Sequence, residues 1–180
     1  RLDDNSKISL KTFSGKWRSI PITANNVDIS NLTVPFLKSD LHSSFDLAEL
    51  NDLTGNKSIQ FMSGTGQMDI DYKGSLVQAD TIETVVNGEI GLKNMAINYM
   101  PRNIILKDMT GNLVFKNQDL FIETLSAHAG STVLNMNGTV RNLIRMIYID
   151  PARLTMEWNV STPYLDLSDF IGFLEKKRTT

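Results

Sequence analysis

The stretch Thr110–Asn142 reads TGNLVFKNQDLFIETLSAHAGSTVLNMNGTVRN and divides into three short extended runs. The first places Leu113 and Phe115 on one side and ends in the polar turn KNQD. The second begins at Leu120 and ends before the turn AGS, and the third alternates between apolar and polar residues from Thr132 to Val140. Alternation bounded by turn residues is typical of half-buried antiparallel strands. This stretch therefore predicts a β-meander and contains no catalytic motif.

The same alternation extends over most of the remaining chain, and Asn87–Gly88 is a dipeptide that favours a two-residue hairpin turn. We expect a mainly β fold: an elongated, curved antiparallel sheet, a meander that could close into a U-shaped groove, with two or three short capping helices. Ten apolar residues of the alternating runs are expected to share one face of this sheet: Met68, Ile70, Ile90, Leu92, Leu113, Phe115, Leu120, Ile122, Leu134 and Met136.

Helical spacing occurs in two places. Leu47, Leu50 and Leu53 recur at intervals of three before Gly55, which predicts a short helix over 47–53. The hexapeptide FDLAEL that opens this helix at position 45 resembles LDLSDF at 165, about 120 residues later. We interpret the pair as an internal repeat inside one β-rich segment, 1–180, with capping helices near 45–54 and 165–175. A long repeat in a meander favours a stacked, elongated architecture.

Composition excludes several classes of protein. The 180 residues have a formal net charge of −2 and a pI of about 5.7, which argues against nucleic-acid binding because that needs a basic surface. The chain has no cysteine, so disulfides and thiolate metal sites are excluded. No apolar run reaches the 18 residues of a transmembrane helix. The sequence begins at Arg1, and we expect it to be a segment of a longer protein whose membrane anchor lies outside it.

Catalytic and metal-binding motifs are not evident. His42 and His128 are the only histidines, and neither has sequence neighbours that indicate a site. Asp69-Ile70-Asp71 matches the D-x-D pattern that can hold a divalent cation, but in a strand it is better interpreted as two outward carboxylates beside an inward isoleucine. We therefore expect no catalytic residue, no metal and no cofactor.

The ten apolar residues have two interpretations that the sequence leaves open. They could form an ordinary sheet face packed on a core. They could instead line a face left open for an apolar ligand, because few helices are expected to cover the sheet. Burial of each large apolar side chain contributes roughly 1.5–3 kcal/mol, so either way this row must be shielded from water.

Three segments carry a resemblance to a known family. They are the strand Ile104–Asp108, the stretch Gly111–Ile122, and LNMNGTVRNL at 134–143, with STPYLDLSDF at 161–170 closing the pattern. Together and in this order they resemble the C-terminal periplasmic region of AsmA-like proteins of the Bacteroidetes type, a family related to TamB-like and bridge-like lipid-transfer proteins. The resemblance covers about Gly66 to Leu174 and rests on hydrophobic alternation with Gly and Asn.

The resemblance implies a non-enzymatic envelope protein of Gram-negative bacteria, anchored in the inner membrane, with this segment in the periplasm. Such proteins are implicated in phospholipid transport and outer-membrane biogenesis through an apolar β-sheet groove, so the expected partners are phospholipid acyl chains. The lipid species and the oligomeric state are not predicted.

Two other functional classes remain open at this point. One is a structural or assembly module that contacts outer-membrane or other envelope proteins by edge-strand pairing. The other is a hydrolase of envelope polysaccharide, which would need two carboxylates close together in a cleft.

Overall fold

The computed structural model of the chain describes residues 6–54, 57–76, 84–149 and 154–171. Within these ranges nine strands succeed one another along the chain. They are β1 (Lys7–Trp17), β2 (Ile20–Ser30), β3 (Phe36–Asp46), β4 (Ile59–Ser75), β5 (Val85–Tyr99), β6 (Ile104–Asn117), β7 (Asp119–Ala129), β8 (Thr132–Val140) and β9 (Met156–Ser161).

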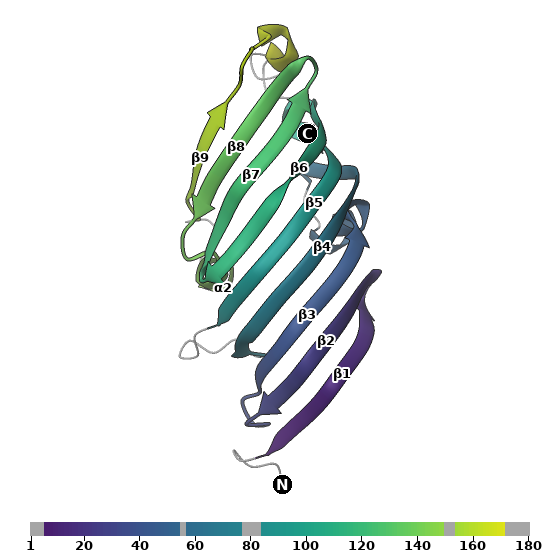
Figure 1. Cartoon of the computed structure of the whole chain (residues 1–180), viewed down its shortest axis with the longest axis vertical. Helices are drawn as coiled ribbons and strands as arrows, with labels where there is room; N and C mark the ends of the chain where they lie inside the picture. Colours follow the sequence, from purple (N-terminus) through teal and green to yellow (C-terminus); the bar gives the residue numbers. More distant parts are fainter. Residues whose placement is uncertain (1–5, 55–56, 77–83, 150–153, 172–180) are drawn as a thin grey trace.

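All nine strands belong to one antiparallel sheet in which each strand pairs with its sequence neighbours, in the order β1 to β9 (Figure 1). The prediction of a mainly β, curved meander is confirmed. The turns predicted in the stretch 110–142 are confirmed as well, because β6 ends at Asn117, β7 ends at Ala129 and β8 begins at Thr132. Local turn chemistry was sufficient there because successive strands are also neighbours in space.

The helical elements are short and lie at the ends of strands. They are the 3-10 helix η1 (Leu47–Glu49), α1 (Leu50–Thr54), the 3-10 helix η2 (Met100–Arg102), α2 (Leu143–Ile149) and the 3-10 helix η4 (Leu167–Phe170). The helix predicted over 47–53 is thus split into a 3-10 turn and an α-helical turn. Of the helix predicted near 165–175, the described part is η4, and residues beyond 171 lie outside the described chain.

The register gives the sheet two chemically different faces. Residues paired across neighbouring strands point to the same side, so a row can be followed from strand to strand. One such row joins Leu41 on β3, Ile70 on β4, Gly88 on β5 and Phe115 on β6. We call the side that contains this row the apolar face, and the opposite side the polar face.

The core lies on the apolar face. Leu47 of η1 is only 1% exposed and belongs to one buried cluster with six residues of β5, β6 and β7: Leu92, Met95, Met109, Ile122, Leu125 and Ala127. Phe45 and Leu50 pack against this cluster, so η1 and the start of α1 form the only helical cover of this cluster within the described residues.

The prediction of a hairpin turn at Asn87–Gly88 is wrong. Both residues lie inside β5, where Asn87 pairs with Asp71 and Gly88 with Ile70. Gly88 has a φ of 127°, and a Cβ atom there would lie 2.1 Å from the carbonyl oxygen of Asp69. The glycine therefore serves a close approach of two backbones within the sheet, which glycine permits as readily as it permits a turn.

Candidate functional site

The ten predicted apolar residues all lie on the apolar face. Their cross-strand pairs make this explicit: Met68 with Ile90, Ile90 with Leu113, Leu113 with Ile122, and Phe115 with Leu120. Ile70, Leu92 and Met136 join the same face through their own partners, and Leu134 joins it by pairing with Ala127. The structure thus places these residues together, while their role as ligand contacts or as core stays a prediction.

The apolar face extends well beyond the ten residues. It runs without interruption from Ile8, Leu10, Phe13 and Trp17 on β1 to Met156, Trp158 and Val160 on β9. Alternation alone was a weaker signal in β1, because that strand contains Lys11 between Leu10 and Thr12 and is mostly polar in sequence.

Exposure of the apolar face changes from the centre of the sheet to its edges. Central residues such as Ile70, Leu92 and Ile122 are buried. At the edges Trp17 is 61% exposed and Val160 is 58% exposed, and the other apolar-face residues of β1 and β9 named above are exposed as well. An exposed row of large apolar side chains indicates a surface that contacts something other than water.

The paired residues of the apolar face offer few polar groups that could bind a ligand. No residue paired across strands on this face carries a charge within the described part of the chain. Its buried hydroxyls are already used: Ser39 Oγ donates to the Asn25 carbonyl oxygen at 3.0 Å, Ser43 Oγ to the Pro21 carbonyl oxygen at 2.6 Å, and Thr132 Oγ1 to Asp169 Oδ2 at 2.9 Å. A ligand on this face would therefore be held by apolar contact and not by hydrogen bonds.

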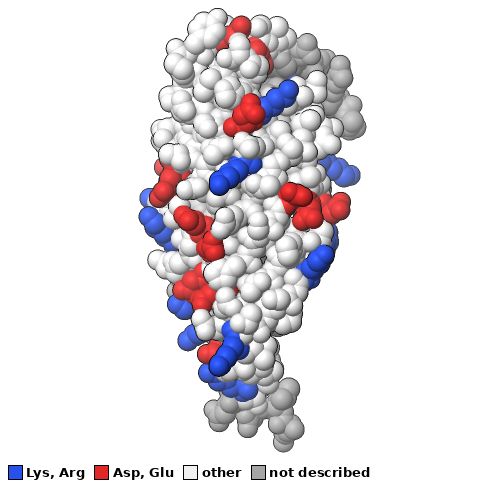
Figure 2. Space-filling view, turned by 45° about the vertical axis from the view of Figure 1, so that its right-hand side comes forward, with Lys and Arg blue, Asp and Glu red and all other residues white. Residues whose placement is uncertain are grey.

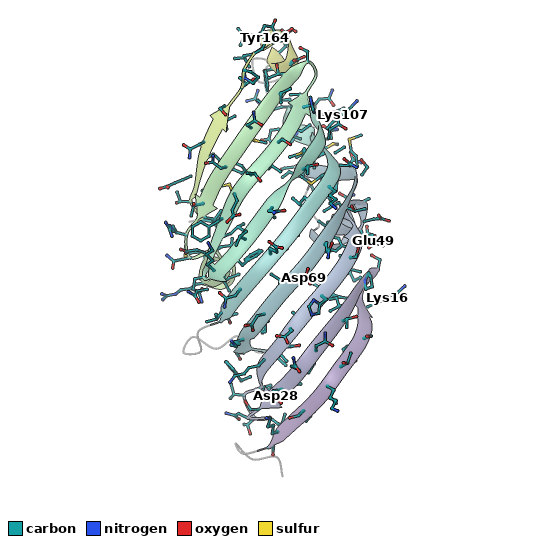
Figure 3. All side chains as sticks on the ribbon, in the orientation of Figure 1. Lys16, Asp28, Glu49, Asp69, Lys107 and Tyr164 are labelled. Carbon is teal, nitrogen blue, oxygen red and sulfur yellow. The ribbon has the colours of Figure 1, made fainter. Side chains whose placement is uncertain are left out.

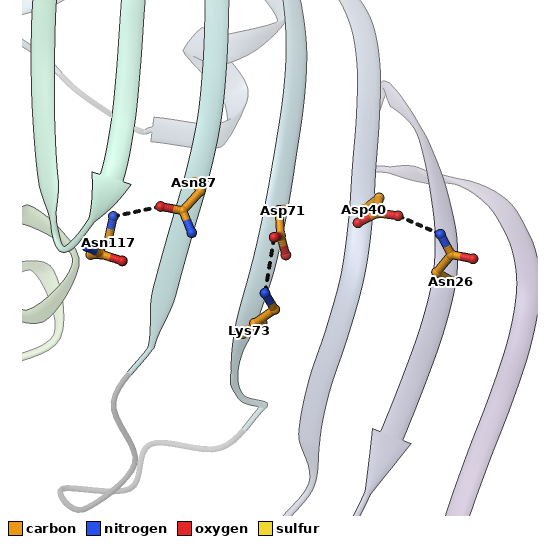
Figure 4. Close-up of polar contacts among 6 residues, drawn as sticks. All are labelled: Asn26, Asp40, Asp71, Lys73, Asn87 and Asn117. Carbon is orange, nitrogen blue, oxygen red and sulfur yellow. Dashed lines mark hydrogen bonds and ion pairs between the residues drawn. The ribbon is translucent and has the colours of Figure 1, made fainter.

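The polar face carries the charges, and these are mixed in sign. Asn26 Nδ2 donates to Asp40 Oδ2 at 2.7 Å, and the Lys73 ammonium lies 3.2 Å from Asp71 Oδ2 (Figure 4). Figure 2 shows Lys, Arg, Asp and Glu scattered over the visible surface without a large region of one sign.

Both aspartates of the D-x-D motif, Asp69 and Asp71, lie on the polar face, and Ile70 between them is buried on the other (Figure 3 labels Asp69). Each histidine has an acidic neighbour that the sequence did not reveal. His42 Nδ1 lies 2.6 Å from Asp69 Oδ1, and His128 Nδ1 lies 3.7 Å from Asp108 Oδ2. These contacts join residues distant in the chain, and all four side chains are well exposed to solvent.

Asp28 of β2 is another well-connected carboxylate of the polar face and lies next to the edge strand β1 (Figure 3). Ser9 Oγ donates to its Oδ1 at 2.6 Å and the Lys7 ammonium lies 3.1 Å away. The hydrogen bond from Ser9, followed by that from Lys7, holds the pKa of Asp28 below its ordinary value. The arrangement ties β1 to β2 on the side opposite the apolar face.

Asp169 of η4 has a carboxylate that accepts several hydrogen bonds, and the sequence analysis did not predict these contacts. Its Oδ2 accepts from the backbone N–H groups of Ser131 and Thr132, both at 3.0 Å, and from their hydroxyls at 3.1 and 2.9 Å. Partial burial raises the pKa of Asp169, and the hydrogen bonds from Thr132 and Ser131 lower it by more, so the net pKa is below its ordinary value. The four donors belong to Ser131 of the β7–β8 turn and to Thr132, the first residue of β8, so this carboxylate fastens η4 to the sheet.

Among the described residues no group of three or more His, Asp or Glu side chains is arranged to hold a metal ion. In the same part of the chain, no helix is both long and apolar enough to cross a membrane. Comparison with known proteins found no matching family model, no matching curated protein and no matching solved structure.

Proposed function

We propose that the protein holds the acyl chains of phospholipids against its apolar face, as a periplasmic segment of an AsmA-like envelope protein that serves lipid transport and outer-membrane biogenesis. The observation that carries the proposal is the continuous apolar face, which crosses all nine strands and ends in exposed large side chains at both edges.

The chemistry of the face suits a hydrocarbon chain. Each CH₂ group removed from water contributes about 0.8 kcal/mol without any need for hydrogen-bond donors or acceptors. The apolar face offers such contact and, among the described strands, no charged paired residue. A headgroup would remain in water beyond the edge strands, where the exposed residues of β1 and β9 lie.

The placement of the carboxylates also supports a lipid-binding protein over a hydrolase. In a hydrolase of polysaccharide, two carboxylates would have to face each other across a cleft. Asp40 and Asp71 pair directly across β3 and β4, and Asp69 and Glu89 pair directly across β4 and β5. Both pairs therefore lie side by side on neighbouring strands of the polar face. The proposal is therefore non-enzymatic and involves neither metal nor cofactor.

The proposal is tested by purifying the chain under mild conditions and identifying bound phospholipid by mass spectrometry. We expect phospholipid to copurify with the wild-type protein. Leu134→Asp places a charge on the apolar face and is expected to abolish capture, and Leu113→Asp and Phe115→Asp should act in the same way. The matched control is Asn135→Asp, which places the same charge at the next residue of β8 on the polar face.

Leu134 is only partly exposed, so a charge there could unfold the sheet instead of blocking the lipid. Phe13→Asp avoids this ambiguity because Phe13 is exposed on the edge strand β1. It should retain the far-UV circular dichroism of the wild type and reduce the amount of bound lipid. The proposal is wrong if a well-folded wild type carries no phospholipid, or if Asn135→Asp loses as much lipid as Leu134→Asp.

A second candidate function is assembly with envelope proteins through an edge strand. The exposed apolar residues of β1 favour it, because an added strand would cover them. Photo-crosslinking from position 17 distinguishes the two candidates, since capture of protein and not of lipid by a probe replacing Trp17 would support the second.

A further inference from the structure

The two segments that share the pattern FDLAEL and LDLSDF also share a local structure. Asp46 is the N-cap residue of η1, and Asp166 is the N-cap residue of η4. Each 3-10 helix comes after the last of three successive strands, β1–β3 in the first case and β7–β9 in the second. The sequence repeat therefore corresponds to two similar units of three strands and a cap.

Each cap is fastened to the turn of the hairpin that precedes its strand. In the first unit Arg18, in the β1–β2 turn, donates from Nη1 to the carbonyl oxygen of Asp52 in α1. In the second unit Ser131 and Thr132, at the β7–β8 turn, donate to Asp169 of η4. The residues differ, and so does the helical turn that is held, which is α1 in the first unit and η4 itself in the second; in both units the contact runs from the preceding hairpin turn to the segment after the strand.

The two units differ in the strands that surround the cap. In the first unit β4 pairs with β3, and Asn51 joins α1 to β4 through hydrogen bonds with the backbone N–H and carbonyl of Phe61 at 2.9 and 2.7 Å. In the second unit β9 pairs with β8 alone among the described strands. The equivalent residues accordingly have opposite environments: Leu47 is 1% exposed and Leu167 is 68% exposed.

The second unit therefore has an exposed apolar surface, and the residues that form it lie close together in the sequence. Seven of the exposed large hydrophobic residues of the described chain lie between 156 and 171: Met156, Trp158, Val160, Tyr164, Leu165, Leu167 and Ile171. The three on β9 point to the apolar face, beside the edge of β9 that pairs with no other described strand (Figure 1 places β9 at the margin of the sheet). An unpaired strand edge with apolar side chains beside it is a template for another strand.

We propose that the free edge of β9, together with η4, is a binding site for a β-strand with the chemistry of β4. Such a strand runs antiparallel to β9, carries apolar residues at alternate positions on the apolar face, as Met68 and Ile70 do, and carries polar residues between them. It completes the second unit as β4 completes the first, and its apolar side chains cover Trp158 and Val160.

The test uses the whole 180-residue chain, freed of lipid, and a synthetic peptide with the sequence of β4, residues 59–75. We expect the peptide to slow hydrogen exchange of the backbone amides of β9. It should also shift the fluorescence of Trp158, which becomes the single tryptophan reporter in a Trp17→Phe background. A peptide with Met68 and Ile70 replaced by Ser serves as the control ligand.

Two substitutions on β9 form a matched pair. Val160→Asp places a charge on the apolar face, where the incoming strand would lie, and should weaken peptide binding roughly tenfold or more because it forfeits burial of a large apolar side chain. Ser161→Asp places the same charge on the opposite face of the same strand and should leave binding within about twofold. Both residues are exposed, so both variants are expected to keep the fold.

The inference is overturned if the β4 peptide protects no amide of β9, if it protects β1 instead, or if Val160→Asp and Ser161→Asp behave alike. It is also overturned if the chain without peptide forms a dimer through β9, since the occupant would then be a second copy. Lipid capture is measured separately, with variants on β1, β6 and β8, so failure of strand binding at β9 and failure of lipid capture are distinguishable.

Discussion

The two units that end in η1 and η4 show that one sequence pattern can occur in a buried and in an exposed environment. In both, an aspartate precedes a 3-10 helix; the preceding hairpin turn is hydrogen-bonded to α1, which follows η1, in the first unit, and to η4 itself in the second. Leu47 is nevertheless at the centre of the core, whereas Leu167 is in water. The helix itself is therefore not the element that buries the leucine.

The difference lies in the strands that come later in the chain. Leu47 is covered by residues of β5, β6 and β7, which come after its own unit in the sequence. Within the described residues no strand comes after β9, so Leu167 lacks the equivalent cover. Burial of a capping residue in this sheet is thus decided by strands that come later in the chain, and equivalent substitutions in the two units should have unequal effects.

The largest difference is expected at the two equivalent leucines. Leu47→Ala removes a fully buried side chain and should destabilise the protein by about 2–5 kcal/mol. Leu167→Ala removes an exposed one and should change stability by no more than about 0.5 kcal/mol. Urea unfolding of both variants and the wild type measures this. Equal midpoints for the two variants would contradict the assignment of the core.

The next difference is expected at Asn51 and its counterpart Ile171. Asn51→Ala leaves the N–H and carbonyl of Phe61 without their side-chain partner and should cost roughly 1–3 kcal/mol. Ile171→Ala should be within about 0.5 kcal/mol of the wild type, because Ile171 is half exposed. The check is urea unfolding combined with hydrogen exchange at Phe61, where exchange should accelerate in Asn51→Ala alone.

A pH-dependent difference is expected at Asp169. Its pKa is lower in the folded chain than the ordinary value of 3.8, so its stabilising contribution is complete above that value and is lost as the pH falls through the folded pKa. Exchange of the Ser131 and Thr132 amides, corrected for intrinsic rates, should therefore accelerate in acid. Asp169→Asn should accelerate it at neutral pH and remove the pH dependence.

The matched control for Asp169 is Glu49, the equivalent residue of the first unit. Glu49 Oε2 is buried and accepts no hydrogen bond from the described residues. Glu49→Gln should leave exchange of the Ser131 and Thr132 amides unchanged at every pH. An acid-induced opening of the β7–β8 turn that persists in Asp169→Asn would show that another group controls it.

The smallest effect is expected at Arg18. Its hydrogen bond to the carbonyl of Asp52 joins two exposed groups, so Arg18→Ala should cost no more than about 0.5–1 kcal/mol. The loss should be confined to faster amide exchange in α1. Lys16→Ala, an exposed change on the same hairpin, is the control, and a global loss of stability in Arg18→Ala would indicate a larger role for this contact.

Much of the fold was predictable because a meander pairs neighbours. Period-two alternation assigns each side chain to a face once the strands are known, which is why all ten predicted residues, from Met68 to Met136, lie on the apolar face. Glycine was less informative: Gly88 was compatible with a turn and with a close approach of strands, and only the pairing of β4 with β5 distinguished the two.

The contacts of the candidate site beyond this face could not be predicted. Ser131 and Thr132 are nearly forty residues from Asp169, and His42 is 27 residues from Asp69. No local periodicity reports such pairs, because they depend on where the ends of different strands lie in space.

Residue patterns alone were enough to establish the strands of the central stretch, the two faces of the sheet and the two similar capping segments, since each depends on residues within a few positions of one another. The folded sheet was needed to establish which members of the apolar face are buried and which are exposed. A side chain is shielded by strands elsewhere in the sheet, and β9, at the edge, has described strands on one side only.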